Sequence, residues 1–265
     1  MLLAMRKNAA ISPLKGRLHR LPGTSVRKKL LEVLLGKGVT YILVGMSGLV
    51  LACLAWIWYL TGSEPTLEIA LFLTVMALML AGVGTWKFRN ALAEGEDLAL
   101  ARDGEVATGQ ALEKLRSAGY DVFHDIPADG FNIDHVLIGA TGIYAIETKT
   151  RRKPRPDARV SYNEEKVWVD GHEPDRNPVT QAKAQADWVR EKLKASTGIQ
   201  FPVRPVVVYT GWYVEQPRRP WQQYVWVLTE KHLPAFLEHQ RAKIKMPDVH
   251  LAKSRVAELA KVDSE

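Results

Sequence analysis

The stretch that decides the fold is IDHVLIGATGIYAIETK, residues 133–149. Two runs rich in apolar and β-branched residues flank the turn signal GATG, which is typical of a β-hairpin. If Ala140 and Thr141 form a two-residue tip, Gly139 lies opposite Gly142 and the numbers of all paired residues sum to 281. The sequence therefore predicts two antiparallel strands over residues 132–138 and 143–149.

Three charged residues interrupt this apolar stretch. The hairpin register places Asp134 directly opposite Glu147, and strand alternation puts Lys149 on the same face. Like charges opposite each other on a sheet repel, and a divalent cation between the two carboxylates offsets that repulsion. Because these ligands are oxygen atoms, we expect Mg²⁺ or Mn²⁺ rather than zinc. The alternative is that Asp134 caps a turn while Glu147 and Lys149 form an ordinary salt bridge.

The flanking pattern predicts a mixed α/β domain over residues 102–240. Apolar spacing predicts two helices, and alternating or continuous apolar runs predict further strands. The helices are expected at 104–119 and 177–198, a strand at 120–126, a small hairpin at 159–171, and two strands at 203–211 and 224–229. His135 lies on the face opposite Asp134, so we expect it to be a packed core histidine. Residues 241–265 are expected to form a charged C-terminal tail, helical or frayed.

Two uncharged stretches precede this domain, at residues 39–60 and 69–86. Each is long enough to cross a hydrocarbon core of about 30 Å at roughly 1.5 Å per residue. Helices of soluble proteins normally carry a polar stripe, and these stretches have none. They predict a transmembrane helical hairpin, joined to the α/β domain by a juxtamembrane linker, residues 87–101. The alternative is a pair of buried helices in a soluble protein.

The charges around these stretches predict their orientation. Residues 1–38 carry nine Lys or Arg residues and one Glu, whereas the short connecting loop carries only Glu64 and Glu68. Since an excess of Lys and Arg marks the cytoplasmic side, we expect both termini and the α/β domain in the cytoplasm. The basic tail holds a charge of +8, more than the +7 of the whole chain, so the overall basicity indicates an anionic lipid partner. The lone Cys53 excludes a disulfide framework and a thiolate zinc cluster.

Three motifs together resemble a known family. They are GEVATGQALEKL at residues 104–115, the hairpin at 133–149 and NPVTQAKAQADWV at 177–189. Their combination resembles the nuclease-related domain family, NERD, which is similar to the restriction-endonuclease-like nucleases with a D…(D/E)-x-K signature. The resemblance covers residues 102–210. It implies a restriction-endonuclease-like α/β fold, in which helices flank a mixed sheet. It also implies an enzyme that hydrolyses phosphodiester bonds of DNA, or of RNA, with Mg²⁺ or Mn²⁺.

The resemblance also implies roles for individual residues. Asp134 and Glu147 match the metal-binding carboxylates, with the carbonyl of Thr148 completing the shell. Lys149 matches the catalytic lysine, which orients or deprotonates the attacking water and stabilises charge on the phosphate.

Two helical residues match further positions of the family. Glu105 matches an acid on the first helix, near the metal, and Gln181 matches a glutamine that faces the site from the second helix. The ordinary alternatives are that Glu105 complements the dipole of a first helical turn and that Gln181 is a surface residue.

A basic loop, RRKPRPDAR at residues 151–159, follows the hairpin. We expect it to attract a nucleic-acid backbone through Arg151, Arg152, Lys153 and Arg155, although such charge runs also occur as solvated surface. Two other functions are compatible with the sequence. One is a catalytically inactive module that binds nucleic acid or protein at the membrane, and the other is a membrane-anchored sensor or scaffold.

Overall fold

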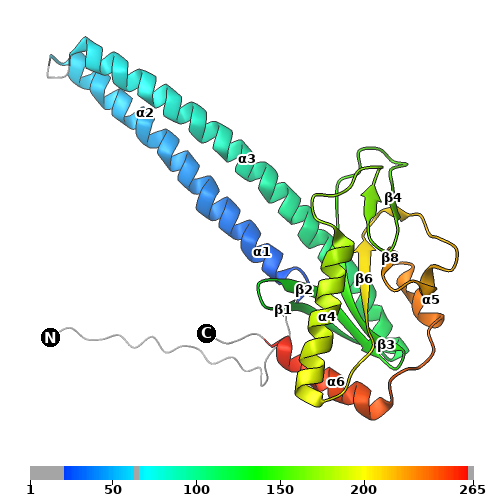
Figure 1. Cartoon of the computed structure of the whole chain (residues 1–265). Coiled ribbons are helices and arrows are strands. Elements are labelled where there is room, and N and C mark those ends of the chain that lie inside the picture. The colour runs from blue at the N-terminus through cyan, green and yellow to red at the C-terminus, as the bar shows by residue number, and fades with distance from the viewer. Residues whose placement is uncertain (1–20, 63–65, 262–265) are drawn as a thin grey trace, which may run out of the picture.

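The computed structural model describes residues 21–62 and 66–261 and has two parts (Figure 1). A long pair of helices projects from an α/β domain. The first 20 residues of the expected basic tail lie outside the described residues, and so does Glu64. Residues 24–38, the rest of that tail, are helical and continue into the first apolar stretch.

Each arm of the helical hairpin is longer than the predicted membrane span. Helix α1 (Thr24–Leu31), a π-helical segment η1 (Glu32–Gly38) and α2 (Val39–Leu60) follow one another without a break. The returning helix α3 (Leu67–Glu113) has 47 residues. Both arms are long and apolar enough to cross a membrane. The predicted linker at 87–101 and most of the helix predicted at 104–119 are parts of α3, which leads into a 3₁₀ segment η2 (Lys114–Ala118).

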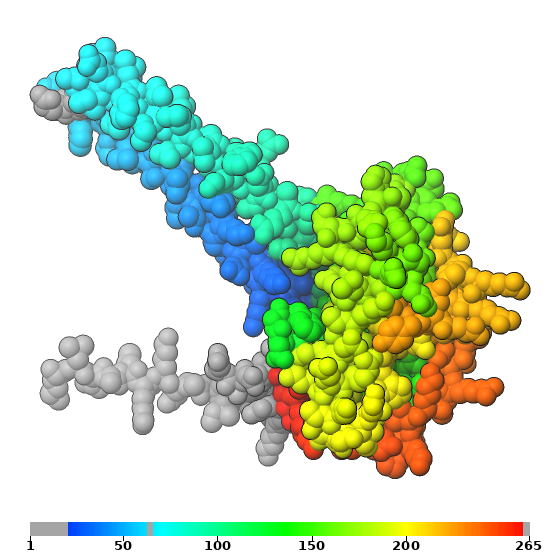
Figure 2. All heavy atoms as spheres, viewed as in Figure 1, coloured from blue at the N-terminus to red at the C-terminus, as the bar shows by residue number. Residues whose placement is uncertain are grey.

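Small residues form the seam between α2 and α3. Along α3, Ala70, Ala77, Gly84 and Ala91 are buried at a spacing of seven residues, and Gly48 and Ala55 repeat that spacing on α2. This period is typical of coiled-coil packing, and small side chains let two backbones approach closely. A Cβ atom at Gly84 would lie 3.0 Å from the carbonyl oxygen of Tyr41. The large apolar side chains are exposed instead; they include Leu43, Leu51, Phe72 and Leu78. Figure 2 shows the hairpin as a rod that projects from the rest of the molecule.

The α/β domain contains a five-stranded mixed sheet in the order β1-β2-β3-β6-β8. Strands β1 to β3 pair antiparallel, and β3, β6 and β8 pair parallel. A second sheet has the order β5-β4-β7. The strands are β1 (Asp121–Pro127), β2 (Asn132–Gly139), β3 (Gly142–Lys149), β4 (Arg159–Tyr162), β5 (Val167–Val169), β6 (Val203–Tyr209), β7 (Tyr213–Val214) and β8 (Trp226–Leu228).

The register of the central hairpin is the predicted one. Gly139 pairs with Gly142, and the ladder continues to the pair His135 and Ile146. Along β3, Ile143 and Ala145 pack in one core cluster, while Tyr144 and Ile146 pack in the cluster on the other face. The alternation expected from the sequence therefore holds.

Helices cover both faces of the five-stranded sheet. Helix α4 (Pro178–Thr197) packs on one face; it begins at the N-cap Asn177 and ends at Gly198, whose φ is 73°. The end of α3 and the short helix α5 (Leu233–Glu238) pack on the other face. Helix α6 (Met246–Leu259) lies beside α4.

The C-terminal segment, expected at 241–265 as a charged tail that is helical or frayed, forms the helix α6 in its described part, but this helix is packed and not a free tail. Val249, Ala252 and Val256 of α6 are buried in the same core cluster as Ile138 and Leu193. These three residues recur at helical spacing and form an apolar stripe that packs against α4 and the sheet. This segment therefore belongs to the core of the domain.

Candidate active site

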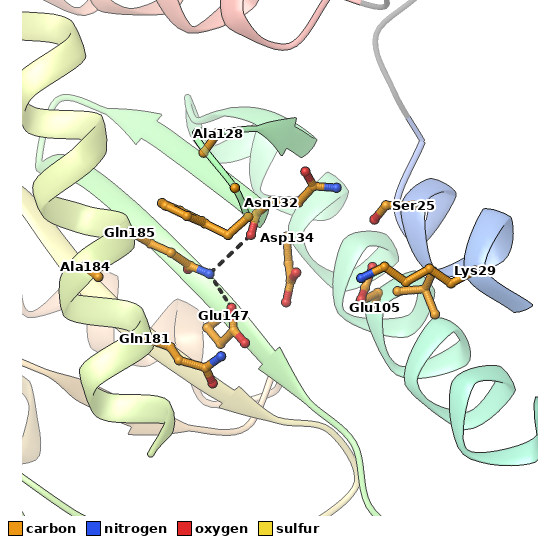
Figure 3. A pocket seen from close by; sticks show the side chains of 13 residues that line it. Ser25, Lys29, Glu105, Ala128, Asn132, Asp134, Glu147, Gln181, Ala184 and Gln185 are labelled. Carbon is orange, nitrogen blue, oxygen red and sulfur yellow. Dashed lines mark hydrogen bonds between the residues drawn. The ribbon is translucent and has the colours of Figure 1, made fainter. Parts of the chain in front are cut away.

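A cavity of about 680 Å³ opens where the end of the sheet meets the helical hairpin (Figure 3). Helices α1 and α3 form one wall, α4 forms another, and β2 and β3 form the floor. Its polar lining side chains are Ser25, Lys29, Glu105, Asn132, Asp134, Glu147, Gln181 and Gln185.

Asp134 and Glu147 both line this cavity. The hairpin register, continued one step beyond the pair His135 and Ile146, places them opposite each other. The backbone N–H of Thr148 donates a hydrogen bond to Asp134 Oδ2 at 2.7 Å. Burial raises the pKa of Asp134 well above its usual range, and the charges of Glu147 and Glu105 raise it further. The two carboxylates thus face one space, as the sequence predicted.

Lys149 and Gln185 hold Glu147 from two sides. Lys149 Nζ lies 2.5 Å from Glu147 Oε1, so the salt bridge considered as the ordinary alternative is present. Lys149 itself lines a separate small cavity and not the carboxylate cavity. Gln185 Nε2 donates a hydrogen bond to Glu147 Oε2 and a longer one, 3.4 Å, to the carbonyl of Asn132. Glu147 is only 6% exposed, so these contacts fix the orientation of a buried carboxylate.

Sequence reasoning missed Gln185. The residue predicted to face the site, Gln181, does line the cavity, and its buried Oε1 has no hydrogen-bond partner within the described chain. Gln185 follows it by one helical turn and makes the direct contact with Glu147. The spacing of four residues in NPVTQAKAQ was the available signal, because positions i and i+4 share a helix face.

Glu105 reaches the site because of its neighbour Gly104. A Cβ atom at Gly104 would lie 1.6 Å from Thr150 Oγ1, so only glycine allows α3 to lie this close to the end of β3. Burial, followed by the charges of Asp125 and Glu147, raises the pKa of Glu105 to about 7, against an opposing hydrogen bond from the backbone N–H of Gly23. The helix-dipole alternative is wrong, because α3 begins at Leu67 and Glu105 lies deep inside it.

The donor groups fit a hard divalent cation. Over residues 21–62 and 66–261, no three His, Cys, Asp or Glu side chains meet as a ready-made metal cluster. Mg²⁺, however, is commonly held by one or two carboxylates and keeps several water molecules. Burial first, and then repulsion among neighbouring carboxylates, raises the pKa values of Asp134 and Glu105. A cation held by Asp134 and Glu147 would offset that repulsion.

Comparison with protein families agrees with this geometry. Residues 100–210 match the family model of the nuclease-related domain, NERD. The matched segment runs from the end of α3 to the end of β6 and contains every carboxylate of the cavity, Lys149 and both glutamines. No curated protein and no solved structure matches the chain.

The basic loop of the NERD segment lies against the rest of the protein. Arg152 pairs with Glu96 of α3 at 2.8 Å, and Arg155 pairs with Asp170 at 2.7 Å. Lys153 lies over the ring of Trp212, and Arg151 lines a small cavity together with Lys149. The two ion pairs are exposed and therefore weak, so a polyanion can compete for these guanidinium groups.

The NERD segment also contains a buried histidine pair. His124 Nδ1 lies 2.8 Å from His135 Nδ1, and His124 Nε2 lies 2.9 Å from Glu113 Oε1. With both rings neutral, His124 donates through Nε2–H to Glu113, and its Nδ1 accepts a hydrogen bond from Nδ1–H of His135. Burial lowers the pKa of both histidines. His135 is thus the packed core histidine that was predicted. Its hydrogen-bond partner, His124, was not predicted.

Proposed function

We propose that the NERD segment is a metal-dependent nuclease that hydrolyses phosphodiester bonds, with DNA as its substrate. The observation that carries this proposal is the convergence of Glu105, Asp134 and Glu147 on one cavity, with Lys149 paired to Glu147. When bound, Mg²⁺ or Mn²⁺ supplies a water of lowered pKa and neutralises phosphate charge.

In this proposal each side chain has a defined task. Asp134 and Glu147 hold the cation, and the carbonyl of Thr148 is a third candidate ligand. Lys149 orients the attacking water and stabilises the negative charge that develops on the phosphate. Gln185 keeps Glu147 in place, and Glu105, with its raised pKa, is suited to exchange a proton near neutral pH.

We further propose that the hairpin anchors this nuclease to a membrane, with both termini and the α/β domain in the cytoplasm. Two apolar helices with outward-facing large side chains support the anchor. Lys and Arg residues at the end of the hairpin nearest the α/β domain support the orientation. The basic loop, Arg151, Arg152, Lys153 and Arg155, is the proposed contact for the nucleic-acid backbone.

The test uses the full chain in detergent with supercoiled DNA and Mg²⁺. We expect nicking or degradation by the wild type, no cleavage in EDTA, and loss of cleavage in Glu147→Gln. The matched control is Glu165→Gln, because Glu165 is exposed in the β4–β5 turn, and it should cut normally. Equal cleavage by wild type and Glu147→Gln would refute the assignment. A parallel assay with RNA decides the sugar preference.

A second candidate is a catalytically inactive module that binds nucleic acid at the membrane. It is favoured by the contacts of Glu147, whose two oxygens are already engaged by Lys149 and Gln185. Such a module should bind DNA equally well in Mg²⁺ and in EDTA and leave it uncut.

A further inference from the structure

A second polar cavity, of about 520 Å³, lies at the opposite end of β3 and β6 from the carboxylates. It is formed by the turn of the β2–β3 hairpin, the start of β6 and the segments around Tyr224 and Lys243. Its lining includes three cationic side chains and three hydroxyl groups but no Asp or Glu: Arg190, Arg204, Lys243, Thr141, Tyr144 and Tyr224. The charge of this end is therefore opposite to that of the candidate active site.

Arg204 is only partly used by the protein. Its Nη1 group donates hydrogen bonds to the backbone carbonyls of Gln223 and Tyr224, and its guanidinium lies 4.6 Å from the centre of the Trp226 ring. Burial lowers its pKa. Among the described residues, no carboxylate pairs with it and no acceptor takes the donors on Nη2 and Nε. Trp226 thus fixes a guanidinium that still has free donors.

Lys243 adds a second cation without an acidic partner. Its backbone N–H is tied to the carbonyl of Ala140 at 2.7 Å, whereas its ammonium contacts only Gln240 Oε1, at 3.3 Å, in the described chain. Burial and then the charge of Arg204 lower the pKa of Lys243. Two cations held near each other repel, and a bound anion offsets that repulsion.

The remaining groups shape the wall of the cavity. Arg190 pairs with Asp187 and donates to the hydroxyl of Tyr224 at 3.1 Å, so it positions that ring. The hydroxyls of Thr141 and Tyr144 hydrogen-bond each other at 2.9 Å, and Thr141 also bonds the hydroxyl of Tyr120, so this chain of three hydroxyls leaves one proton to donate.

We propose that this cavity binds a phosphate group through Arg204 and Lys243. A guanidinium fork and an ammonium group are the usual partners of a phosphate, and the one free proton of the hydroxyl chain can donate to a further oxygen. The phosphate belongs either to a small nucleotide or to a nucleic-acid strand that lies on the domain. The site shares no residue with the carboxylate cavity, so it stands independently of the proposed nuclease activity.

The test is calorimetric titration of the full chain in detergent and EDTA, so that no cleavage takes place. The probes are inorganic phosphate, adenosine 5′-monophosphate and a short single-stranded oligonucleotide without terminal phosphates. Lys243→Gln should weaken binding on the order of tenfold, since it removes a hydrogen bond to a charged group. Lys231→Gln, at an exposed position outside the cavity, is the matched control and should bind as the wild type does.

The probes also separate the two sources of the phosphate. If Lys243→Gln loses affinity for inorganic phosphate and for the mononucleotide, the site binds a small ligand. If the loss of affinity is confined to the oligonucleotide, the site binds a nucleic-acid strand. Arg204→Lys should weaken the same probe, because lysine lacks the guanidinium fork. Equal affinity of Lys243→Gln and wild type for every probe would overturn the proposal. So would the absence of binding by all three probes up to about 10 mM.

Discussion

The helical hairpin and the α/β domain distribute apolar side chains in opposite ways. In the hairpin, Ala77 and Gly84 lie inside while Phe72 and Leu78 face outward. In the domain, large residues such as Leu112 and Trp226 are almost completely buried. Large apolar side chains are stable when they are kept away from water. The difference therefore indicates lipid around the hairpin, which exposes them, and water around the α/β domain, which buries them. The comparison also shows where charges are buried, since the domain concentrates carboxylates at one end of its sheet.

The largest expected effect tests whether the domain holds charges such as Glu147 and Lys149 for catalysis. If they serve catalysis, Lys149→Met should lower the rate of DNA cleavage by about 10² to 10³, the usual effect of losing one group that stabilises the transition state. The measurement is cleavage by the full chain with Mg²⁺, and Lys114→Met, at an exposed position in η2, serves as the control. Unchanged cleavage would mean that the ion pair with Glu147 is structural.

The second prediction compares two leucines in α3. Leu112 is 1% exposed in the domain core, so Leu112→Ala should reduce the free energy of unfolding by about 2 to 5 kcal/mol. Leu78 is 63% exposed on the hairpin, so Leu78→Ala should leave the stability in detergent almost unchanged. Chemical unfolding of both variants measures the difference. Equal losses would contradict the inverted packing.

The third prediction tests the seam of small residues. Gly84→Ala places a methyl group against the carbonyl of Tyr41, and we expect a loss of about 1 to 3 kcal/mol from overpacking. Gly82→Ala meets no atom within 4 Å and should be neutral or stabilising, because alanine favours a helix over glycine. Thermal unfolding in detergent compares the pair. A stable Gly84→Ala protein would show that the two helices do not pack closely.

The smallest expected effect is the pH dependence of the domain. The pKa values of His124 and His135 are lowered in the folded state, so only the unfolded chain takes up their protons as the pH falls below about 6.5. The free energy of unfolding should therefore keep its full histidine contribution above that pH. Below it, this free energy should fall by at most ~1.4 kcal/mol per pH unit for each histidine.

The variant that isolates this effect is His124→Gln, measured in EDTA between about pH 7.5 and 5.5. Because the raised pKa values of Asp134 and Glu105 act in the opposite direction, only the difference between variant and wild type is informative. The variant should lose less stability on acidification than the wild type. Parallel curves would show that the histidine pair takes up protons without unfolding.

Local patterns predicted much of the fold from the sequence. The central hairpin and its register follow from the turn GATG and the apolar runs beside it, and α4 follows from its amphipathic spacing, with Pro178 near its start and Gly198 past its end. The helical linker could not be predicted in this way, because the polar residues of 87–101 carry no strong apolar period. Its structure comes from continuity with the helix on either side. The role of α6 was missed because its stripe of three small or β-branched residues is short and surrounded by charges.

The candidate site was predictable where one strong local turn fixes the distances, as for Asp134, Glu147 and Lys149. It was not predictable where two elements meet only in the folded state. Gln185 reaches Glu147 from a helix. The contact between His124 and His135 had an available signal, because Asp129-Gly130 is a two-residue turn sequence that sets the register of β1 and β2.

The unbroken course of α3 holds the α/β domain at a fixed distance from the apolar part of the hairpin. From Trp86, at the end of the second apolar stretch, to Glu105 the helix rises roughly 28 Å at about 1.5 Å per residue. Without an interruption along this path, the domain cannot swing freely relative to the hairpin. In the proposed membrane-anchored nuclease, the active site would therefore stay in a shallow layer above the lipid headgroups, and a DNA strand would have to enter that layer to be cut. Adding a single residue to α3 between Trp86 and Glu105 would turn the Glu105 side chain by about 100° about the helix axis, away from Asp134 and Glu147.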